Sequence, residues 1–506
     1  MILVELTAAI DAAGTLQTFY VSTDRFVTAP TDTPANTAFE PSLTDPGSIG
    51  ISAFGDGRTG GGTKLEVGEI VLANANGQYD AWINYGFDGR AVTIRTGTTG
   101  AYPAAFSTIL TGTVEAVEAT RKQVVIRLRD KQFIFAAPVL TTKYAGTNSL
   151  PNGLEGTATD IKGQAKPRTL GKVFNIQPAF INTSKLTFQV SDGAVSDIVA
   201  VYDRGASITK GADYANSTLL QAAAPGAGTY ITCFAEGLFR LGSSPAGEIT
   251  VDVTQGANAA ARTVAQILKQ LALDAGVSAG SISAADVTAL DTANSAVVGL
   301  YVSGDTTFQQ AMDQIAASVG AFYGFDGAGV LRMGRLTAPS GTAVTTLEDF
   351  HILNIERRVL RDVSIPIWSA TVNHTRLGVA QPNDLAGAVT AATRAYLASE
   401  YRAEVATDAA IKTQFLLAPD MTVDTLLTSA SDAATEAARL LALFKVRRDA
   451  LDVTVRSDVV ASNALKLMDV ITVKSARFGL SAGKDFRVLG IRTELSKSRA
   501  VLTVWG

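Results

Sequence analysis

Short strand-like runs separated by Gly, Asn and Asp fill the first 140 residues, and they limit what this part of the chain can form. In the segment 124–130, VVIRLRD, Arg127 and Arg129 alternate with Ile126 and Leu128. A period of two is typical of a half-exposed β-strand. No helical period of useful length follows the first dozen residues, so we expect a β-rich N-terminal region. Similar runs lie at 68–74, 91–97 and 107–119.

The middle of the chain begins with a change of composition. Residues 141–170 are dominated by Gly, Pro, Asn and Thr, which is typical of a long connection rather than an element. Short strands with turn signals such as SDG and DRG then resume and continue to about residue 255.

Two amphipathic helices follow, at 261–276 and 305–320. Gly276 and Gly320 are natural stops, and Asp305 or Thr306 can cap the second helix. The segment 321–334, AFYGFDGAGVLRMG, predicts a hairpin, so this region is an α+β unit. The apolar faces hold Val264, Ile267, Leu268, Leu271 and Ala275 in the first helix, and Phe308, Met312, Ile315 and Val319 in the second.

The last third returns to strands, with one Ala-rich helical stretch at 431–450. Its apolar stripe and its basic C-terminal end favour a helix. The strand-like runs at 451–457, 468–475, 486–496 and 500–506 predict an antiparallel sheet or small barrel. The stripe holds Ala437, Leu440, Leu441 and Phe444, and the basic end holds Lys445, Arg447 and Arg448.

Composition excludes several classes of function. A net charge of −4 gives no footprint for nucleic acid bound from outside. The single cysteine, Cys233, excludes an internal disulfide framework, and its apolar neighbours favour a buried strand thiol. Only His351 and His374 are available for histidine chemistry. We find no signal peptide and no apolar run of 18 residues, so we expect folding in a cytoplasm.

Two glycine motifs lack the context that their chemistry needs. GDGRTG at 55–60 matches a dinucleotide fingerprint, but loop and strand follow it instead of a helix. GVSAG at 276–280 matches a nucleophile elbow around Ser278, but a helix enters it instead of a strand. We interpret the first as a Gly-rich loop and the second as a helix stop followed by a linker.

Acidic and amide side chains suggest two other sites. The pairs Glu115 with Glu118 and Asp80 with Asp88 could serve glycoside hydrolysis only if both groups share a cleft. The segment 74–80, NANGQYD, lacks the EF-hand ladder, although its oxygens leave calcium as an alternative. Asn-Gly at 76–77 and Asp-Gly at 88–89 are hairpin-turn dipeptides, so we expect turns here.

In order, these segments resemble the hub proteins of bacteriophage tails, above all those of long-tailed, non-contractile phages and gene transfer agents. The resemblance covers most of the chain. Its parts are 68–97, the central stretch 166–214 with KPRTLGKVFNIQPAF and VYDRGASITKGADY, the helical pair with its hairpin, and the ending 465–506.

The resemblance implies a mainly β chain with an α+β insertion. Two tail-tube-like β-barrel domains would flank a smaller β domain and an α+β domain. The expected division is 1–165 for the first barrel region, 166–250 for the β-rich domain, 251–345 for the α+β insertion, and 346–506 for the second barrel region with one helix.

The resemblance also implies a trimeric ring that adapts a six-fold tail tube or distal tail ring to a three-fold tip. The implied partners are two further copies, the distal tail protein, the tape measure protein, central tail-tip or fibre proteins, and genomic DNA passing through the lumen without specific binding. The implied location is the virion tail tip. Some relatives hold an iron–sulfur cluster, which a chain with Cys233 alone is not expected to carry.

We therefore expect no enzyme activity, no catalytic or metal residues and no cofactor. Two alternatives from other classes stay open. One is a cell-wall-degrading tail hydrolase, and the other is a receptor-binding adhesin, which is also β-rich and trimeric.

Overall fold

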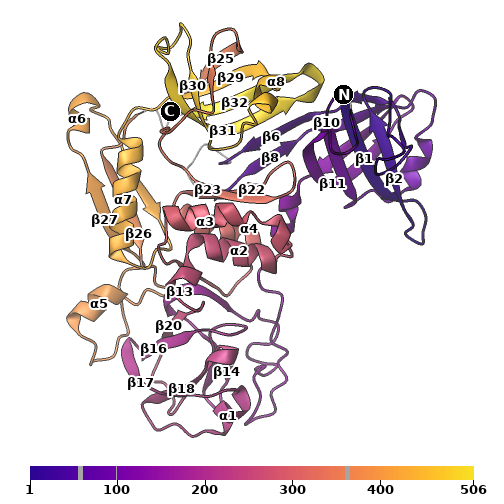
Figure 1. Ribbon diagram of the computed structural model, residues 1–506. Coiled ribbons are helices and arrows are strands. Elements are labelled where there is room, and N and C mark those ends of the chain that lie inside the picture. The colour runs from indigo at the N-terminus through magenta and orange to yellow at the C-terminus, as the bar shows by residue number, and fades with distance from the viewer. Residues whose placement is uncertain (55–60, 99, 359–364) are drawn as a thin grey trace.

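The computed structural model describes residues 1–54, 61–98, 100–358 and 365–506. The chain is mainly β and forms several connected bodies (Figure 1). Two curled sheets lie side by side at one end, a nine-stranded sheet lies at the other, and helices occupy the middle. The expected fold class, mainly β with an α+β insertion and two barrel-like sheets, is confirmed.

The N-terminal sheet has seven strands and is curled. Apolar side chains alternate along the strands and fill its interior. Glu40 lies three residues before one edge strand and bonds the other, since its N–H donates to Tyr20 O at 3.0 Å and its C=O accepts from Ser22 N at 2.8 Å. The order is β2 (Leu16–Ser22), β1 (Ile2–Ala9), β10 (Ala91–Thr96), β11 (Ser107–Ala119), β12 (Gln123–Arg129), β9 (Ile70–Ala73) and β5 (Leu43–Asp45), with β3 (Phe26–Val27) and β4 (Ala38–Phe39) as a small outer pair.

The C-terminal sheet repeats this curled form. Its two edge strands, β24 and β25, follow each other in the chain and are separated only by residues 348–351, so the sheet must curve to bring them together. Its interior is an aliphatic cluster around Phe486. The order is β24 (Thr345–Leu347), β30 (Val470–Val473), β31 (Lys484–Glu494), β32 (Arg499–Trp505), β29 (Ala450–Arg456) and β25 (Ile352–Arg358).

A ribbon from the N-terminal region joins the two curled sheets. It consists of β6 (Ser48–Ser52) and β8 (Lys64–Val67), which pair antiparallel. β6 also pairs with the second half of β31, from Ser48 opposite Glu494 to Ser52 opposite Gly490. The first 70 residues thus supply strands to both sheets.

The nine-stranded sheet forms the opposite end of the molecule. A tight turn joins β16 to β17, and its central residues Arg204 and Gly205 have φ of +50° and +76°. Two successive positive φ values are the geometry that glycine favours in such turns. The order is β14 (Ala179–Asn182), β15 (Thr187–Gln189), β19 (Leu238–Leu241), β18 (Thr229–Cys233), β17 (Ala206–Asp213), β16 (Asp197–Asp203), β20 (Ile249–Thr254), β13 (Arg168–Ile176) and β21 (Gly299–Val302), with α1 (Ser217–Ala222) beside it.

The helical unit holds the largest core cluster and packs between the sheets. Both sequence-predicted helices are confirmed, as α2 (Val264–Asp274) and α4 (Phe308–Ala317). The predicted hairpin is also confirmed, as β22 (Ala321–Phe325) with β23 (Leu331–Arg335), and β7 (Gly61–Gly62) extends it in parallel.

Local hydrogen bonds explain the ends of these helices. Gly276, with φ of +97°, ends α2 by donating to Leu273 O at 3.0 Å, while Val277 N donates to Ala272 O at 3.0 Å. The predicted cap of α4 is wrong. Thr307 takes this role instead of Asp305 or Thr306, because its hydroxyl accepts from Gln310 N while the Gln310 side chain accepts from Thr307 N.

One helix was missed in the segment that we interpreted as a linker. It is α3 (Ala284–Ala293), which buries only Val287 and Leu290 and so has a weak apolar period. The pattern Ser283-Ala-Ala-Asp286 was its available signal, since the Ser283 side chain accepts from Asp286 N.

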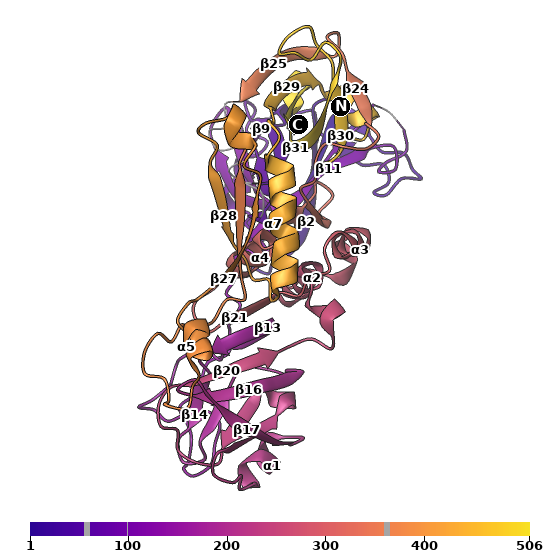
Figure 2. The same cartoon turned by 90° about the vertical axis from the view of Figure 1, so that its left-hand side faces the viewer.

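A further α+β unit lies between β25 and β29. Its sheet contains β27 (Arg402–Thr407), β26 (Ser369–His374) and β28 (Asp420–Asp424), and α7 (Ala430–Phe444) covers one face (Figure 2). The expectation of one helix in 346–506 is wrong, because α5 (Ala391–Leu397), α6 (Ile411–Gln414) and α8 (Ser457–Ser462) also occur there. These helices span two turns or fewer, which is too short to display a period.

Residues 375–400 leave this unit and attach to the nine-stranded sheet. Gly378 N donates to Phe174 O at 2.9 Å, and Val379 N donates to Asn175 O at 2.9 Å. Leu385 and Leu397 of this segment pack together in an apolar cluster. The attachment ties the C-terminal third of the chain to its centre. Short 3-10 helices occur at Asp80–Asn84, Lys131–Ala136, Phe234–Glu236, Ala259–Arg262, Ala279–Ser281 and Leu495–Lys497.

Candidate functional site

Ser278, His351 and His374 are the residues considered for nucleophilic catalysis, and each bonds a different neighbour. Ser278 caps a 3-10 turn, and its hydroxyl bonds that of Ser281 at 2.8 Å. His351 lies beside β25, where its Nδ1 accepts from Glu348 N at 3.3 Å. His374 is buried in β26 with Nδ1 against the Thr375 hydroxyl at 2.8 Å, and burial lowers its pKa. GVSAG is therefore a helix stop, as predicted. The motif at 55–60 lies outside the described residues.

All four carboxylates of the two pairs, Glu115 with Glu118 and Asp80 with Asp88, are exposed at the surface. Glu118 lies on the surface of β11 and pairs with Arg127 at 3.1 Å, which also contacts Glu69 at 3.0 Å. Asp80 lines a shallow hollow of about 490 Å³ whose walls hold no second carboxylate. A glycosidase needs an acid and a second carboxylate on opposite sides of one bond.

The stretch 74–90 forms turns, as predicted, but they are not hairpins. Gly77 and Gly89 have φ of +75° and +69°. Asp80 Oδ1 accepts from Asn74 Nδ2 at 2.8 Å, and Asn74 Oδ1 accepts from Tyr79 N at 2.9 Å. These turns flank the 3-10 helix that carries buried Trp82, so they fix an aromatic core residue. In the described parts of the chain, no three His, Cys, Asp or Glu side chains are grouped to hold a metal ion.

Cys233 is a buried thiol at the end of β18, as predicted. Burial raises its pKa, which disfavours the reactive thiolate. No helix in the described ranges is long and apolar enough to cross a membrane.

A buried ion cluster joins the helical unit to the last third of the chain. Glu436 in α7 is 2% exposed and accepts from Arg439 at 2.6 and 3.0 Å. Arg335, at the end of β23, pairs with the other side of this carboxylate. Burial lowers the pKa of Arg335 to about 10, so the cation is partly desolvated. The sequence did not reveal this cluster, because no local pattern marks Glu436 as a buried residue.

A second missed group lies where residues 375–400 attach. Asp252 in β20 accepts from Asn175 N at 2.7 Å and from the Tyr202 hydroxyl at 3.0 Å. Burial raises the Asp252 pKa despite these bonds. Asn175, with φ of +48°, also donates to Val379 O at 2.7 Å. The group fixes the attachment point.

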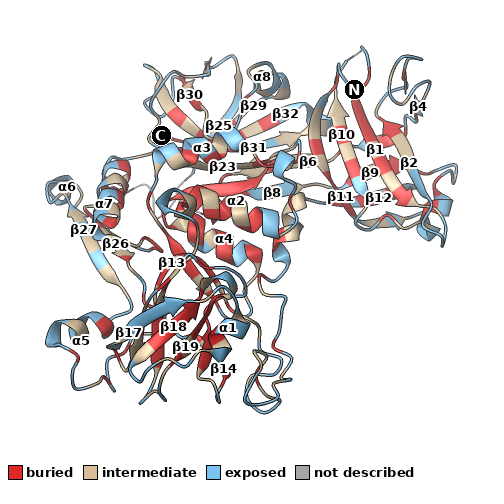
Figure 3. Cartoon of the chain, turned by 60° about the horizontal axis from the view of Figure 1, so that its bottom comes forward, coloured by how far each residue is buried: buried red, intermediate tan, exposed pale blue. Residues whose placement is uncertain are grey.

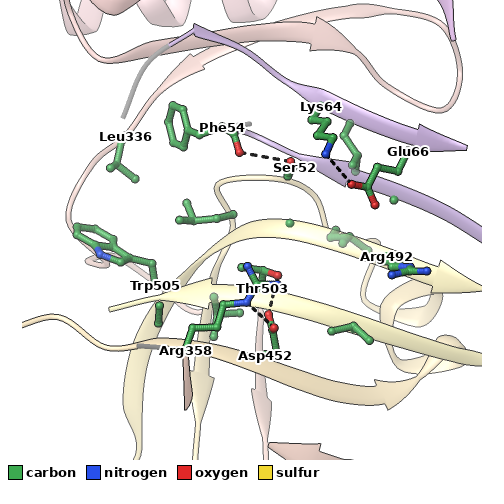
Figure 4. Close-up of a pocket in the computed structure, with 18 of the residues that line it drawn as sticks. Ser52, Phe54, Lys64, Glu66, Leu336, Arg358, Asp452, Arg492, Thr503 and Trp505 are labelled. Atoms are coloured by element: carbon green, nitrogen blue, oxygen red, sulfur yellow. Dashed lines mark hydrogen bonds and ion pairs between the residues drawn. The ribbon is translucent and has the colours of Figure 1, made fainter. Parts of the chain in front are cut away.

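The outer face of the C-terminal sheet carries a groove of about 440 Å³ beside the ribbon (Figure 4). Phe54, Leu336 and Trp505 form its apolar end. Its polar end holds two ion pairs, Lys64 with Glu66 at 3.0 Å and Arg358 with Asp452. These four charges are paired, and Arg492 also lines the groove without an ion pair among the described residues, so the groove has the character of a polar contact surface.

No protein-family model and no curated protein matches the sequence. Solved structures that match the chain include two tail proteins and a chain of a gene transfer agent particle. A tail protein from Neisseria meningitidis is 11% identical, with 93% of each chain covered and a TM-score of 0.42. The 43 kDa tail protein of prophage MuSo2 from Shewanella oneidensis is 12% identical, with 100% of this chain and 98% of that chain covered and a TM-score of 0.42. A chain of the native gene transfer agent virion is 14% identical, with 74% of this chain and 91% of that chain covered and a TM-score of 0.42.

Proposed function

We propose that this chain is the structural hub of a phage tail tip and has no catalytic role. The observation that carries the proposal is the pair of curled sheets built from opposite ends of the chain and joined by the β6–β8 ribbon. A protein with two similar barrels can offer six of them from three copies. Such a ring would match a six-fold tube on one side and a three-fold tip on the other.

The charge of the chain is compatible with a conduit. A lumen that passes DNA must not hold phosphates tightly, and a net charge of −4 provides no excess of cations. The proposed partners are two further copies, a distal tail protein, a tape measure protein and central tail-tip or fibre proteins. The proposed location is the tail tip of the virion, after assembly in the host cytoplasm.

We also retain the division at 165, 250 and 345 as a proposal. Separate apolar clusters inside the two curled sheets and the nine-stranded sheet support three of these four parts.

Mass photometry of the purified protein, with electron cryomicroscopy of the same sample, tests the proposal. A closed three-fold ring with six barrels around a DNA-wide channel is the expected result. A chain that stays monomeric at micromolar concentration, alone and with a six-fold tube protein, would refute the hub.

A further inference from the structure

Two leucines project from the molecule at one place. Leu416 and Leu417 are 83% and 86% exposed, the highest values of any large apolar side chains in the described chain. They occupy the centre of a turn closed by Ala418 N donating to Phe415 O at 2.9 Å. Gly, Pro, Asn and Asp dominate such positions in ordinary surface turns. We call residues 415–418 the dileucine turn.

The turn is held firmly although its tip is uncovered. Phe415 N donates to Ile411 O at 2.9 Å, which fixes the turn to α6. Ala418 is buried, and β28 begins two residues later at Asp420. The chain therefore presents two apolar side chains on an ordered support, at the outer end of the unit that contains α7 (Figure 3).

An apolar groove of about 690 Å³ lies elsewhere on the same chain. It runs between the ribbon, the β22–β23 hairpin and the loop before β30. Its large apolar side chains are mostly only half-buried, so the groove lacks a filling residue from its own chain. The half-buried ones include Ile49, Ile51, Leu65, Leu467, Met468 and Ile491.

The dileucine turn does not reach this groove within one molecule. In the views of Figures 1 and 3, α6 lies at the far side of the molecule from β6 and β8. When a protruding turn and a groove lie at different places on one chain, their contact between copies is heterologous. Such contacts close into a ring when the rotation between successive copies permits it. A ring of three copies requires two such different surfaces on each copy.

Each surface carries charges of both signs, with Lys412 and Asp420 beside the turn and Lys466 and Asp469 on the groove wall. Asp420 is exposed next to the dileucine turn, and Lys466 is exposed on the groove wall. Neither side chain has an ion-pair partner within the described ranges of this chain. Opposite charges at the rim of a contact favour correct encounter and orientation.

We propose that the dileucine turn of one copy inserts into the ribbon groove of the next copy. The inference rests on the proposed function, because it specifies how the three copies of the hub contact one another. It assigns the interface to Leu416 and Leu417 on one side and to the groove on the other, with Asp420 facing Lys466.

The test measures the dissociation constant of the trimer by mass photometry. The variant carries both Leu416→Asp and Leu417→Asp. Losing the burial of each leucine is expected to weaken the trimer about tenfold or more. Leu353→Asp is the matched control, since Leu353 is 51% exposed on edge strand β25 and lies outside the groove. Thermal unfolding of each variant monitors the fold.

A charge exchange provides an independent readout. Asp420→Lys alone and Lys466→Asp alone are each expected to weaken the trimer, and the double variant is expected to restore it. Wild-type trimers that persist unchanged in the double-leucine variant would overturn the inference and leave the hub proposal standing. A wild-type chain that forms no trimer would overturn both.

Discussion

Removing the carboxylate of Glu436 is the substitution whose free-energy cost the structure defines best. In Glu436→Ala, the Arg335 and Arg439 guanidiniums lose their common partner inside the joint between β23 and α7. Side-chain exposures of 9% for Arg335 and 2% for Glu436 place the pair out of water. Breaking a buried pair by removing one partner costs about 3–5 kcal/mol, because it leaves an uncompensated charge.

Hydrogen exchange suits this test better than bulk unfolding, because a chain of several bodies does not unfold in two states. The expected change is a roughly 10²- to 10³-fold faster opening of α7 and the β22–β23 hairpin. Glu118→Ala is the control, since Glu118 forms an exposed pair with Arg127 and such pairs contribute about 0–1 kcal/mol. Less than tenfold acceleration in α7 for Glu436→Ala would refute the assignment of this cluster as a joint.

Three further outcomes can be checked on the purified protein. Gly205→Ala is expected to loosen residues 375–400, because a Cβ at this position with φ of +76° would lie 2.7 Å from Leu385 Cδ2; unchanged exchange there would contradict it. Stability is expected to fall as pH drops below 6.5, because burial lowers the folded-state pKa of His374 and the unfolded chain then binds the proton more tightly; His374→Gln should flatten a denaturant-midpoint series between pH 7.5 and 5. Cys233 should react with a thiol reagent only after denaturation, since it is fully buried, and rapid labelling of the native protein would be inconsistent with its position in β18.

Helices of ten or more residues with a strong apolar period were predictable. α2, α4 and α7 each repeat apolar residues on one face, and that is the face they bury. α3 was not predicted, because two buried residues give little periodicity even though Ser283 and Asp286 form a capping pattern. The prediction of no nucleophile at Ser278 came from context, since the motif needs a strand where the sequence has a helix.

The candidate site residues also divide into those with a local sequence signal and those without one. Turns at Gly77 and Gly89 follow from the residue types, because these glycines adopt positive φ without steric cost. Glu436 and Asp252 carry no such local signal. Their importance arises from burial, which depends on chain segments far away in sequence.

The sequence by itself determined the elements whose pattern is local: the alternation of β12, the faces of the long helices, and the glycines that end them. Only the tertiary structure decided which strands pair. β6 completes β31 from the other end of the chain, and β26 pairs in parallel with β28 across an excursion to another sheet. Side-chain period records which face of a strand is buried, but backbone hydrogen bonds are alike for every strand, so the choice of neighbour depends on the packing of the whole molecule.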